Sequence, residues 1–137
     1  MARKTKNLKN YVYAVGRRKS ASARVRLYRG KGENLVNGVA FEKYFVNLND
    51  AEIWKKPMRV VEATDKYYVT AKVVGGGKNG QVEAVTHGIA RALAKADKDF
   101  RSALKKAGLL KRDPRERERR KIDMGGKARR KRQSPKR

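Results

Sequence analysis

Regularly spaced apolar residues stop at Leu110, and this boundary most limits what the chain can fold into. Residues 111–137 contain 14 basic and 4 acidic residues but only three apolar ones, an Ile, a Met and an Ala. Burying three such side chains cannot offset an ordering cost of about 1–2 kcal/mol per residue. The sequence therefore predicts a folded domain over residues 1–110 and an extended basic tail over residues 111–137.

The balance of basic and acidic residues limits the class of partner that the chain can bind. The chain carries 38 Lys and Arg against 13 Asp and Glu, a formal net charge of +25, and such self-repulsion destabilises a compact state unless a polyanion neutralises it. With no Cys and one His, the chain cannot form disulfides or an ordinary zinc site. No apolar run approaches the roughly 20 residues of a membrane span, and no secretory signal is visible. We predict a nucleic-acid partner and no membrane, metal or other cofactor; a nuclear-import signal would share this composition.

Apolar residues follow two periods within residues 1–110. Alternation predicts strands over residues 22–28 and 67–74, and three-to-four-residue spacing predicts a helix over residues 81–96. This mixture predicts an α+β domain. Two further strands are expected, one over 11–15 stopped by Gly16 and one over 35–36 before an Asn37-Gly38 turn. A helical turn is expected over 41–45, followed by a helix over 50–55 that Asp50 caps and Pro57 ends. The last expected helix is capped by Asp97 or Asp99 and ended by Gly108.

Two neighbouring basic segments give the domain its strongest functional signal. Arg17, Arg18 and Lys19 lie in the expected connection between two strands, and Arg24 and Arg26 continue the charge along the outer face of the next strand. A solvated loop would have the same local composition, but a contiguous basic surface is typical of nucleic-acid binding. The tyrosines that are candidates for stacking on bases, or for core packing, are Tyr11, Tyr13 and Tyr28.

A glycine-rich segment, residues 75–80, separates an expected strand from an expected helix. It contains the pattern G-x-G-x-x-G, but a dinucleotide site also needs a second strand ending in an acidic residue, and residues 94–101 are expected to be helical. A flexible turn with nothing bound is one interpretation. The favoured one is an anion site, in which backbone N–H groups at the helix start hold a nucleic-acid phosphate. The residues assigned to it are Gly76, Gly77, Lys78, Asn79 and Gln81.

No set of residues suited to catalysis is visible. His87 follows Glu83 by one helical turn, which is typical of a polar helix face, and Ser20 and Ser22 have no recognisable base or acid partner. A nucleophile, its base and an orienting group are all needed for a hydrolytic site. We therefore predict that the chain is not an enzyme.

Three ordered blocks of the sequence resemble one known family, that of ribosomal protein nine of the small subunit. The resemblance covers nearly the whole chain, and three blocks at the expected spacing are far more specific than a lone glycine loop. The matching positions are residues 13–19 and 23–25; residues 75–77, 80–81, 84, 88 and 90–93; and residues 112–113, 115, 118–119, 121 and 127–130.

The resemblance implies a four- to five-stranded sheet with helices on one face and an unusual left-handed βαβ crossover, contrary to the usual right-handed rule. It also implies a structural constituent of the head of the small ribosomal subunit, in the cytoplasm, that binds small-subunit ribosomal RNA. Ribosomal proteins seven, ten and fourteen are the implied neighbours, and no homo-oligomer is expected. The tail would reach transfer RNA in the peptidyl site.

Taken together, motif and resemblance assign a set of contact residues. In the common bacterial pattern the chain ends aromatic-Ser-Lys-Arg, whereas here Ser134 and Pro135 precede Lys136 and Arg137. The final pair, Lys136 and Arg137, is assigned to transfer RNA, and a stacking contact by the missing aromatic is not implied. The residues assigned to RNA are Arg17, Arg18, Lys19, Arg24, Arg26, Gly76, Gly77, Lys78, Asn79, Gln81, Arg112, Arg115, Arg119, Arg120, Lys121, Lys127, Arg129, Arg130, Lys131 and Arg132.

Two other functions stay open at this point. A free basic protein that compacts nucleic acid would share the charge, but it has no reason to carry the pattern over residues 81–93. A nucleotide-dependent enzyme built on the glycine segment would bind a dinucleotide. Co-sedimentation with small subunits distinguishes the first alternative from a ribosomal protein, and calorimetry with a dinucleotide tests the second.

Overall fold

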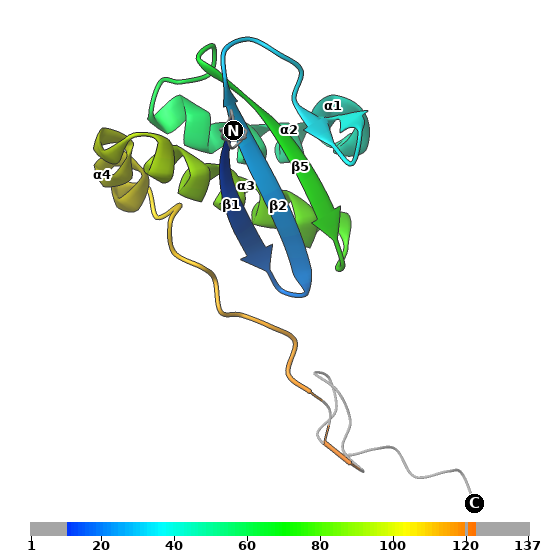
Figure 1. The fold of residues 1–137 in the computed structure, drawn as a ribbon. Coiled ribbons are helices and arrows are strands. Elements are labelled where there is room, and N and C mark those ends of the chain that lie inside the picture. The colour runs from blue at the N-terminus through cyan, green and yellow to red at the C-terminus, as the bar shows by residue number, and fades with distance from the viewer. Residues whose placement is uncertain (1–10, 120, 123–137) are drawn as a thin grey trace, which may run out of the picture.

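The computed structural model describes residues 11–119, 121 and 122, and Figure 1 shows a sheet with helices packed on one side of it. Three strands, β1, β2 and β5, form most of the sheet. The chain then leaves the last helix as an extended segment. In chain order the elements are β1 (Tyr11–Arg18), β2 (Ala21–Arg29), β3 (Leu35–Val36), β4 (Val39–Ala40), α1 (Phe41–Tyr44), α2 (Leu48–Val60), β5 (Tyr67–Val74), α3 (Lys78–Ala96) and α4 (Lys98–Lys106).

The strands form one mixed five-stranded sheet in the order β1-β2-β5-β3-β4. The β1–β2 and β2–β5 pairs are antiparallel, whereas β3 runs parallel to β5. The short β3–β4 hairpin turns at Asn37 and Gly38, whose φ angles of 51° and 83° suit a tight turn. The α+β class and the five-stranded sheet confirm the prediction. The parallel β3–β5 pair is joined through α1 and α2, and the left hand of this crossover stays a prediction from the resemblance.

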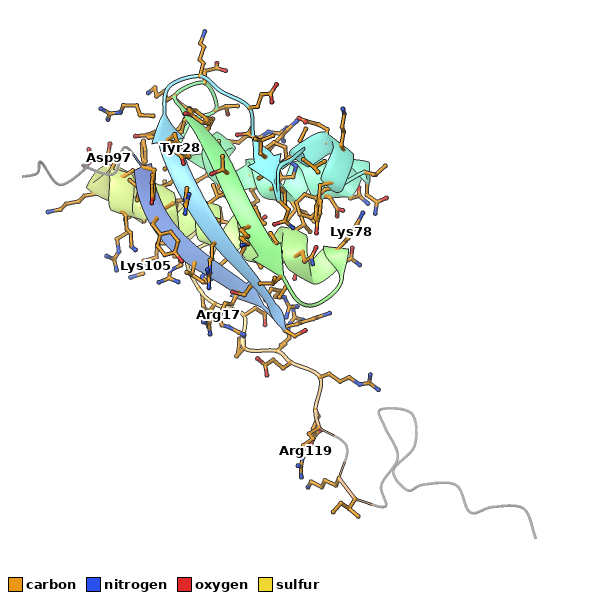
Figure 2. All side chains as sticks on the ribbon, turned by 45° about the vertical axis from the view of Figure 1, so that its right-hand side comes forward. Arg17, Tyr28, Lys78, Asp97, Lys105 and Arg119 are labelled. Atoms are coloured by element: carbon orange, nitrogen blue, oxygen red, sulfur yellow. The ribbon has the colours of Figure 1, made fainter. Side chains whose placement is uncertain are left out.

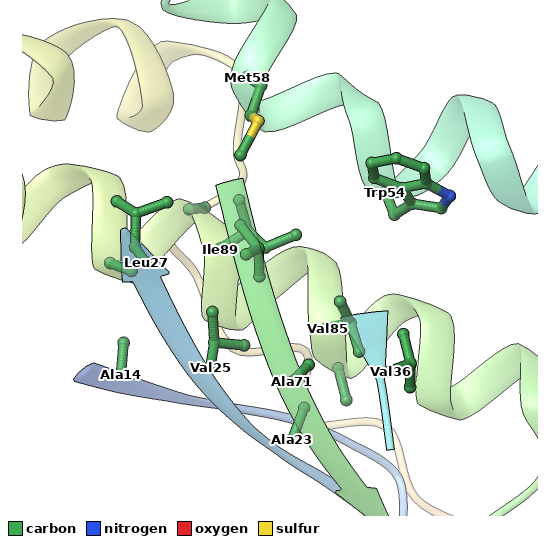
Figure 3. Close-up of a cluster of buried hydrophobic side chains, with 14 of the residues drawn as sticks. Ala14, Ala23, Val25, Leu27, Val36, Trp54, Met58, Ala71, Val85 and Ile89 are labelled. Atoms are coloured by element: carbon green, nitrogen blue, oxygen red, sulfur yellow. The ribbon is translucent and has the colours of Figure 1, made fainter. Parts of the chain in front are cut away.

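The core lies between α3 and the inner face of the sheet (Figure 3). Strand alternation sends Val25, Leu27 and Ala71 to this face, and the stripe of α3 that includes Val85 and Ile89 packs against them. A fully buried Leu, Ile or Val contributes about 1.5–3 kcal/mol relative to exposure. Helices α2 and α4 pack on α3, so the helical layer covers one face of the sheet only.

Two glycines allow α3 to approach β1 closely. A Cβ atom on Gly16 would lie 1.8 Å from the Ala84 carbonyl oxygen, and one on Gly88 would lie 2.5 Å from a methyl carbon of Val25. A glycine inside a helix costs about 1 kcal/mol relative to Ala, and the close approach explains why Gly88 is nevertheless there.

The predicted ends of β1 and α2 were wrong. Strand β1 continues through Gly16 to Arg18, because a residue without a side chain fits against α3 instead of ending the strand. Helix α2 begins after Asn47 rather than Asp50 and passes through Pro57. A proline inside a helix costs about 3 kcal/mol, and burial of Pro57 itself with its neighbours Trp54 and Met58 offsets that cost.

The glycine segment is shorter than expected, because α3 begins at Lys78 instead of Gln81. Gly75 and Gly76 have positive φ angles of 77° and 65°, whereas Gly77 is the extended N-cap residue of α3 with open space beside it. At the other end of the helical layer, Asp97 caps α4 by accepting from the Asp99 N–H, and Gly108 follows α4 with a φ of 74°. The α4 cap and end are therefore confirmed.

Candidate nucleic-acid interface

No described helix covers the face of the sheet opposite α3 (Figure 2), and the strand registers place basic side chains in rows across it. The antiparallel registers place Arg24 opposite Lys72 and Arg26 opposite Thr70 and Tyr13. Arg24, Arg26 and Lys72 are all exposed, and none of the three strands contains an acidic residue. The outward orientation of Arg24 and Arg26 confirms the predicted alternation. Lys72, which sequence reasoning missed, joins them because β5 pairs with β2. We call this surface the open face.

Three tyrosines at one end of the open face pack on one another. The ring of Tyr28 stacks on that of Tyr68 with centroids 4.9 Å apart, and lies 5.5 Å from that of Tyr11. At one end of this row of three rings, the Arg26 guanidinium lies 5.0 Å from the Tyr11 centroid. At the other end, Gly32 lies so close to Tyr68 that a Cβ atom on Gly32 would be 2.8 Å from the Tyr68 ring. These rings therefore stabilise the sheet. Tyr13, 41% exposed, is the most exposed tyrosine of the open face.

The two arginines at the end of β1 point to opposite sides of the strand. Arg17 is exposed on the open face, in register with Ser22 of β2. Arg18 turns to the helical side, where its Nε donates to Glu83 at 2.5 Å and its Nη2 lies 3.4 Å from Asp113. Only 9% of Arg18 is exposed. Its guanidinium therefore has partners within the protein, and the RNA contact of Arg18 stays a prediction.

A shallow pocket lies where the β1–β2 turn meets the start of α3. It is lined by both segments, with Lys19 and Lys78 as its cations. The first backbone N–H groups of α3 have no partner within the helix, and the helix dipole makes this end attractive to anions. The pocket therefore brings together Lys19, Gly76, Gly77, Lys78 and Asn79 of the predicted set.

Gln81 was predicted to contact RNA, but its side chain holds the glycine segment. Its Nε2 donates to the Gly75 carbonyl at 3.1 Å, and its Oε1 accepts from the Tyr44 hydroxyl at 2.7 Å. These bonds tie the segment before α3 to α1. The structure thus gives Gln81 a positioning role at the pocket, and its direct contact with RNA stays a prediction.

The first residues of the tail are bound to the domain and point away from it only later (Figure 1). Arg112 donates to the Asp113 and Lys19 carbonyls and pairs with Glu116 at 3.2 Å. Arg115 pairs with Asp113 but keeps 79% of its side chain exposed. Arg119 and Lys121 are exposed as well. The predicted contacts that lie outside the described residues are Arg120, Lys127, Arg129, Arg130, Lys131, Arg132, Lys136 and Arg137.

Side chains of α3 also bind the outer edge of β1. The Arg17 N–H donates to His87 Nδ1 at 3.3 Å, Arg91 donates to the Val15 carbonyl, and Lys95 donates to the Tyr13 carbonyl at 3.0 Å. Residues 87, 91 and 95 lie one turn apart on one helix face. They satisfy backbone groups that an edge strand otherwise leaves open to another strand. Periodicity alone, which predicted a polar helix face, gives no sign of this role.

His87 joins three parts of the chain. Because its Nδ1 accepts from Arg17, the proton resides on Nε2, which donates to the Leu110 carbonyl at 3.2 Å. Burial lowers the pKa of His87 below its ordinary value of 6.5; the Leu110 carbonyl opposes this change, and the nearby Arg91 and Arg112 add to it. The neutral ring is therefore the form that links β1, α3 and the start of the tail.

We expect this histidine to make stability depend on pH. Because the folded pKa is depressed, the unfolded chain binds the proton first, so the free energy of unfolding decreases as pH falls below about 6.5. Urea midpoints at pH 7.5 and 5.5 measure the decrease, which His87→Gln should reduce. The chain has one histidine, so its ring resonances report the folded pKa directly. A folded value at or above 6.5 would contradict the prediction.

Within the part of the chain that the structure describes, no group of three or more His, Asp or Glu side chains could hold a metal ion. Nor does any described helix have the length and apolar character needed to cross a membrane. The basic open face is the feature of the described residues that is typical of a nucleic-acid-binding protein.

Comparison with known proteins gives the family within that class. A family model described as Ribosomal protein S9/S16 matches residues 16–137. The chain is 46% identical over 118 residues to small ribosomal subunit protein uS9 of Maridesulfovibrio salexigens, which is 86% of this chain and 91% of that protein. It is 47% identical over 116 residues to uS9 of Solidesulfovibrio magneticus, which is 85% of this chain and 89% of that protein. The chain belongs to the ribosomal protein S9/S16 family, a structural rather than catalytic class, which confirms the family prediction and the prediction of a non-enzyme.

Proposed function

We propose that this protein is a structural constituent of the head of the small ribosomal subunit, in the cytoplasm, and binds the ribosomal RNA there. The observation that carries the proposal is the open face, where Arg17, Arg24, Arg26 and Lys72 lie on strands that contain no acidic residue. Family membership supplies the ribosomal context. The pocket at the start of α3 and the tail extend the same positive surface.

The chemistry of this surface favours contacts to phosphate over reading of bases. Arg and Lys side chains and helix-start N–H groups bind phosphate without sequence information. Tyr13 adds a ring on which an unpaired base can stack, as single-stranded and looped RNA often does. We therefore assign the open face to folded ribosomal RNA recognised by its shape, with the pocket holding a backbone phosphate.

The proposed role of the tail is to reach transfer RNA in the peptidyl site. Its start is anchored beside the β1–β2 turn, and the described residues beyond it lead away from the domain (Figure 2). Lys136 and Arg137, which lie outside the described residues, would make the final contacts. Ribosomal proteins seven, ten and fourteen are the proposed neighbours, and we propose no homo-oligomer.

Sedimentation tests the proposal against a free nucleic-acid-compacting protein. A ribosomal constituent should migrate with small subunits through a sucrose gradient at moderate salt. A compacting protein should leave the subunits and bind any RNA or DNA with similar affinity. Recovery of the protein only at the top of the gradient would contradict the ribosomal role.

Neutralising the open face should weaken RNA binding. We expect Arg24→Gln/Arg26→Gln to lower affinity for a transcript of the head of small-subunit ribosomal RNA about 10- to 100-fold, because exposed charge-assisted contacts contribute about 0.7–1.4 kcal/mol each. The salt slope should fall by about 1.5, or roughly 0.7–0.9 for each phosphate that is no longer neutralised. Filter binding measures both quantities. The matched control is Arg101→Gln/Lys105→Gln, which removes two exposed cations from α4; equal reductions in both variants would argue against the open face.

Deleting Lys136 and Arg137 tests whether the end of the tail contacts transfer RNA or serves only as a general anchor on ribosomal RNA. The deletion removes only two of 38 basic residues, so we expect subunits to assemble normally. Retention of transfer RNA in the peptidyl site should weaken by about 1–3 kcal/mol, toward the low end if the contacts are exposed. Filter binding of transfer RNA to purified subunits measures this. Equal affinity at several salt concentrations would mean that these residues do not contact the transfer RNA.

A further inference from the structure

The Arg18 guanidinium joins three segments that are far apart in the sequence. It extends from the end of β1, donates through Nε to Glu83 of α3 at 2.5 Å, and lies 3.4 Å through Nη2 from Asp113 at the start of the tail. Its Nη1 also donates to the Arg115 carbonyl at 3.0 Å. The Arg18 side chain is 10% exposed, against 43% for Glu83 and 31% for Asp113. A cation this buried is stable only when it is paired.

Further contacts fix the same short stretch of the tail to the domain. His87 of α3 donates to the Leu110 carbonyl, and Arg112 reaches back to the carbonyl of Lys19 in the β1–β2 turn. Within the stretch, Asp113 accepts from the backbone N–H and the guanidinium of Arg115. Residues 110–115 therefore lie along the end of β1 and α3 before the chain extends outward.

We propose that Arg18 and Asp113 are positioning residues that set the direction in which the tail leaves the domain before any RNA is bound. The clamp formed by this pair holds the start of the tail beside Lys19, which also lines the pocket at the start of α3. The tail and the pocket thereby form a single basic surface that binds one RNA molecule. Tethering of this kind raises the effective concentration of the second contact once the first has formed. The RNA part of this role rests on the proposed function.

A different use of Arg18, direct contact with phosphate, predicts a different result. A phosphate contact raises the salt slope by roughly 0.7–0.9, whereas a positioning residue changes affinity and leaves the slope unchanged. All three nitrogens of the Arg18 guanidinium have acceptors within the protein, on Glu83, Asp113 and the Arg115 carbonyl. Arg18 therefore presents little charge to RNA. The slope is therefore a readout that distinguishes positioning from contact.

Asp113→Asn tests the clamp with a matched control, Glu118→Gln. Each removes one negative charge from the tail, and Glu118 is exposed and forms no ion pair with another described residue. Asn keeps an oxygen that can accept from the Arg115 N–H but lacks the charge that holds Arg18. In the full-length protein without RNA, we expect exchange of the Arg115 amide, which donates to Asp113, to accelerate about tenfold in Asp113→Asn only, with Asp113→Glu keeping much of the protection. Equal exchange in Asp113→Asn and Glu118→Gln would overturn the clamp.

RNA binding by the same variants tests the positioning role. For the head transcript, removal of an acidic residue alone should raise affinity slightly, as we expect for Glu118→Gln. Asp113→Asn should instead lower affinity about three- to tenfold with an unchanged salt slope, since a pre-positioned tail loses less freedom on binding. Equal affinities in the two variants would overturn the positioning role. If the wild-type protein did not bind the transcript, the proposed function and the positioning role would both fail, and amide exchange would still decide the clamp.

Discussion

Gly16→Ala is expected to destabilise the native state of this protein severely. The new Cβ would lie 1.8 Å from the Ala84 carbonyl oxygen and 2.3 Å from the Gly88 backbone nitrogen. Both are backbone atoms of α3, so no side chain can rotate away. To relieve the overlap, α3 would have to separate from β1 along much of the core. We expect a loss of more than about 4 kcal/mol, a large part of the 5–15 kcal/mol that stabilises a small domain.

Urea unfolding followed by circular dichroism measures this loss of stability. The matched control is Gly77→Ser, because Gly77 has open space around it and an extended φ at the N-cap of α3, where Ser is favoured. That variant should keep the wild-type free energy of unfolding within a few tenths of a kcal/mol. A Gly16→Ala protein with the wild-type midpoint would show that α3 does not pack as closely as described.

Binding of the full-length protein to the head transcript is expected to weaken steeply with salt. The charge of +25 is spread over the open face, the pocket and the tail, and few side chains are placed to read bases. If six to ten phosphates are neutralised, affinity should fall about 10³- to 10⁵-fold between 50 and 200 mM salt. The physical reason is that each bound phosphate releases condensed counterions, and added salt opposes that release.

Filter binding at four or more salt concentrations gives the slope for the full chain and for residues 1–110. Removing the tail deletes 14 of 38 basic residues, so the shorter chain should give a clearly smaller slope. A cooperative thermal melt of the shorter chain establishes that it is folded, which its periodic apolar residues predict. A slope near zero for the full chain would contradict an electrostatic interface.

Much of the fold follows from short-range patterns. Alternation along residues 22–28 and 67–74 correctly predicts buried Val25 and exposed Arg24, because side chains of a strand alternate whatever lies beyond it. The stripe on α3 likewise follows from helix geometry. Pro57 and Gly16 were interpreted as ends of elements by local propensity, and in both cases burial against distant residues outweighs that propensity.

The sequence by itself determined the partner class and the basic outer face, since charge, composition and periodicity need no knowledge of contacts; the domain boundary near Leu110 stays a prediction from the same patterns. Tertiary structure alone decided which basic residues form hydrogen bonds and ion pairs within the protein. Arg17 and Arg18 are neighbours of the same type, yet Arg18 binds residues 65 and 97 positions away, and the Arg17 N–H binds a histidine 70 positions away. Such pairs form only when packing of α3 on β1 brings the segments together, because electrostatic and hydrogen-bond energies depend on distance in space and not on separation along the chain.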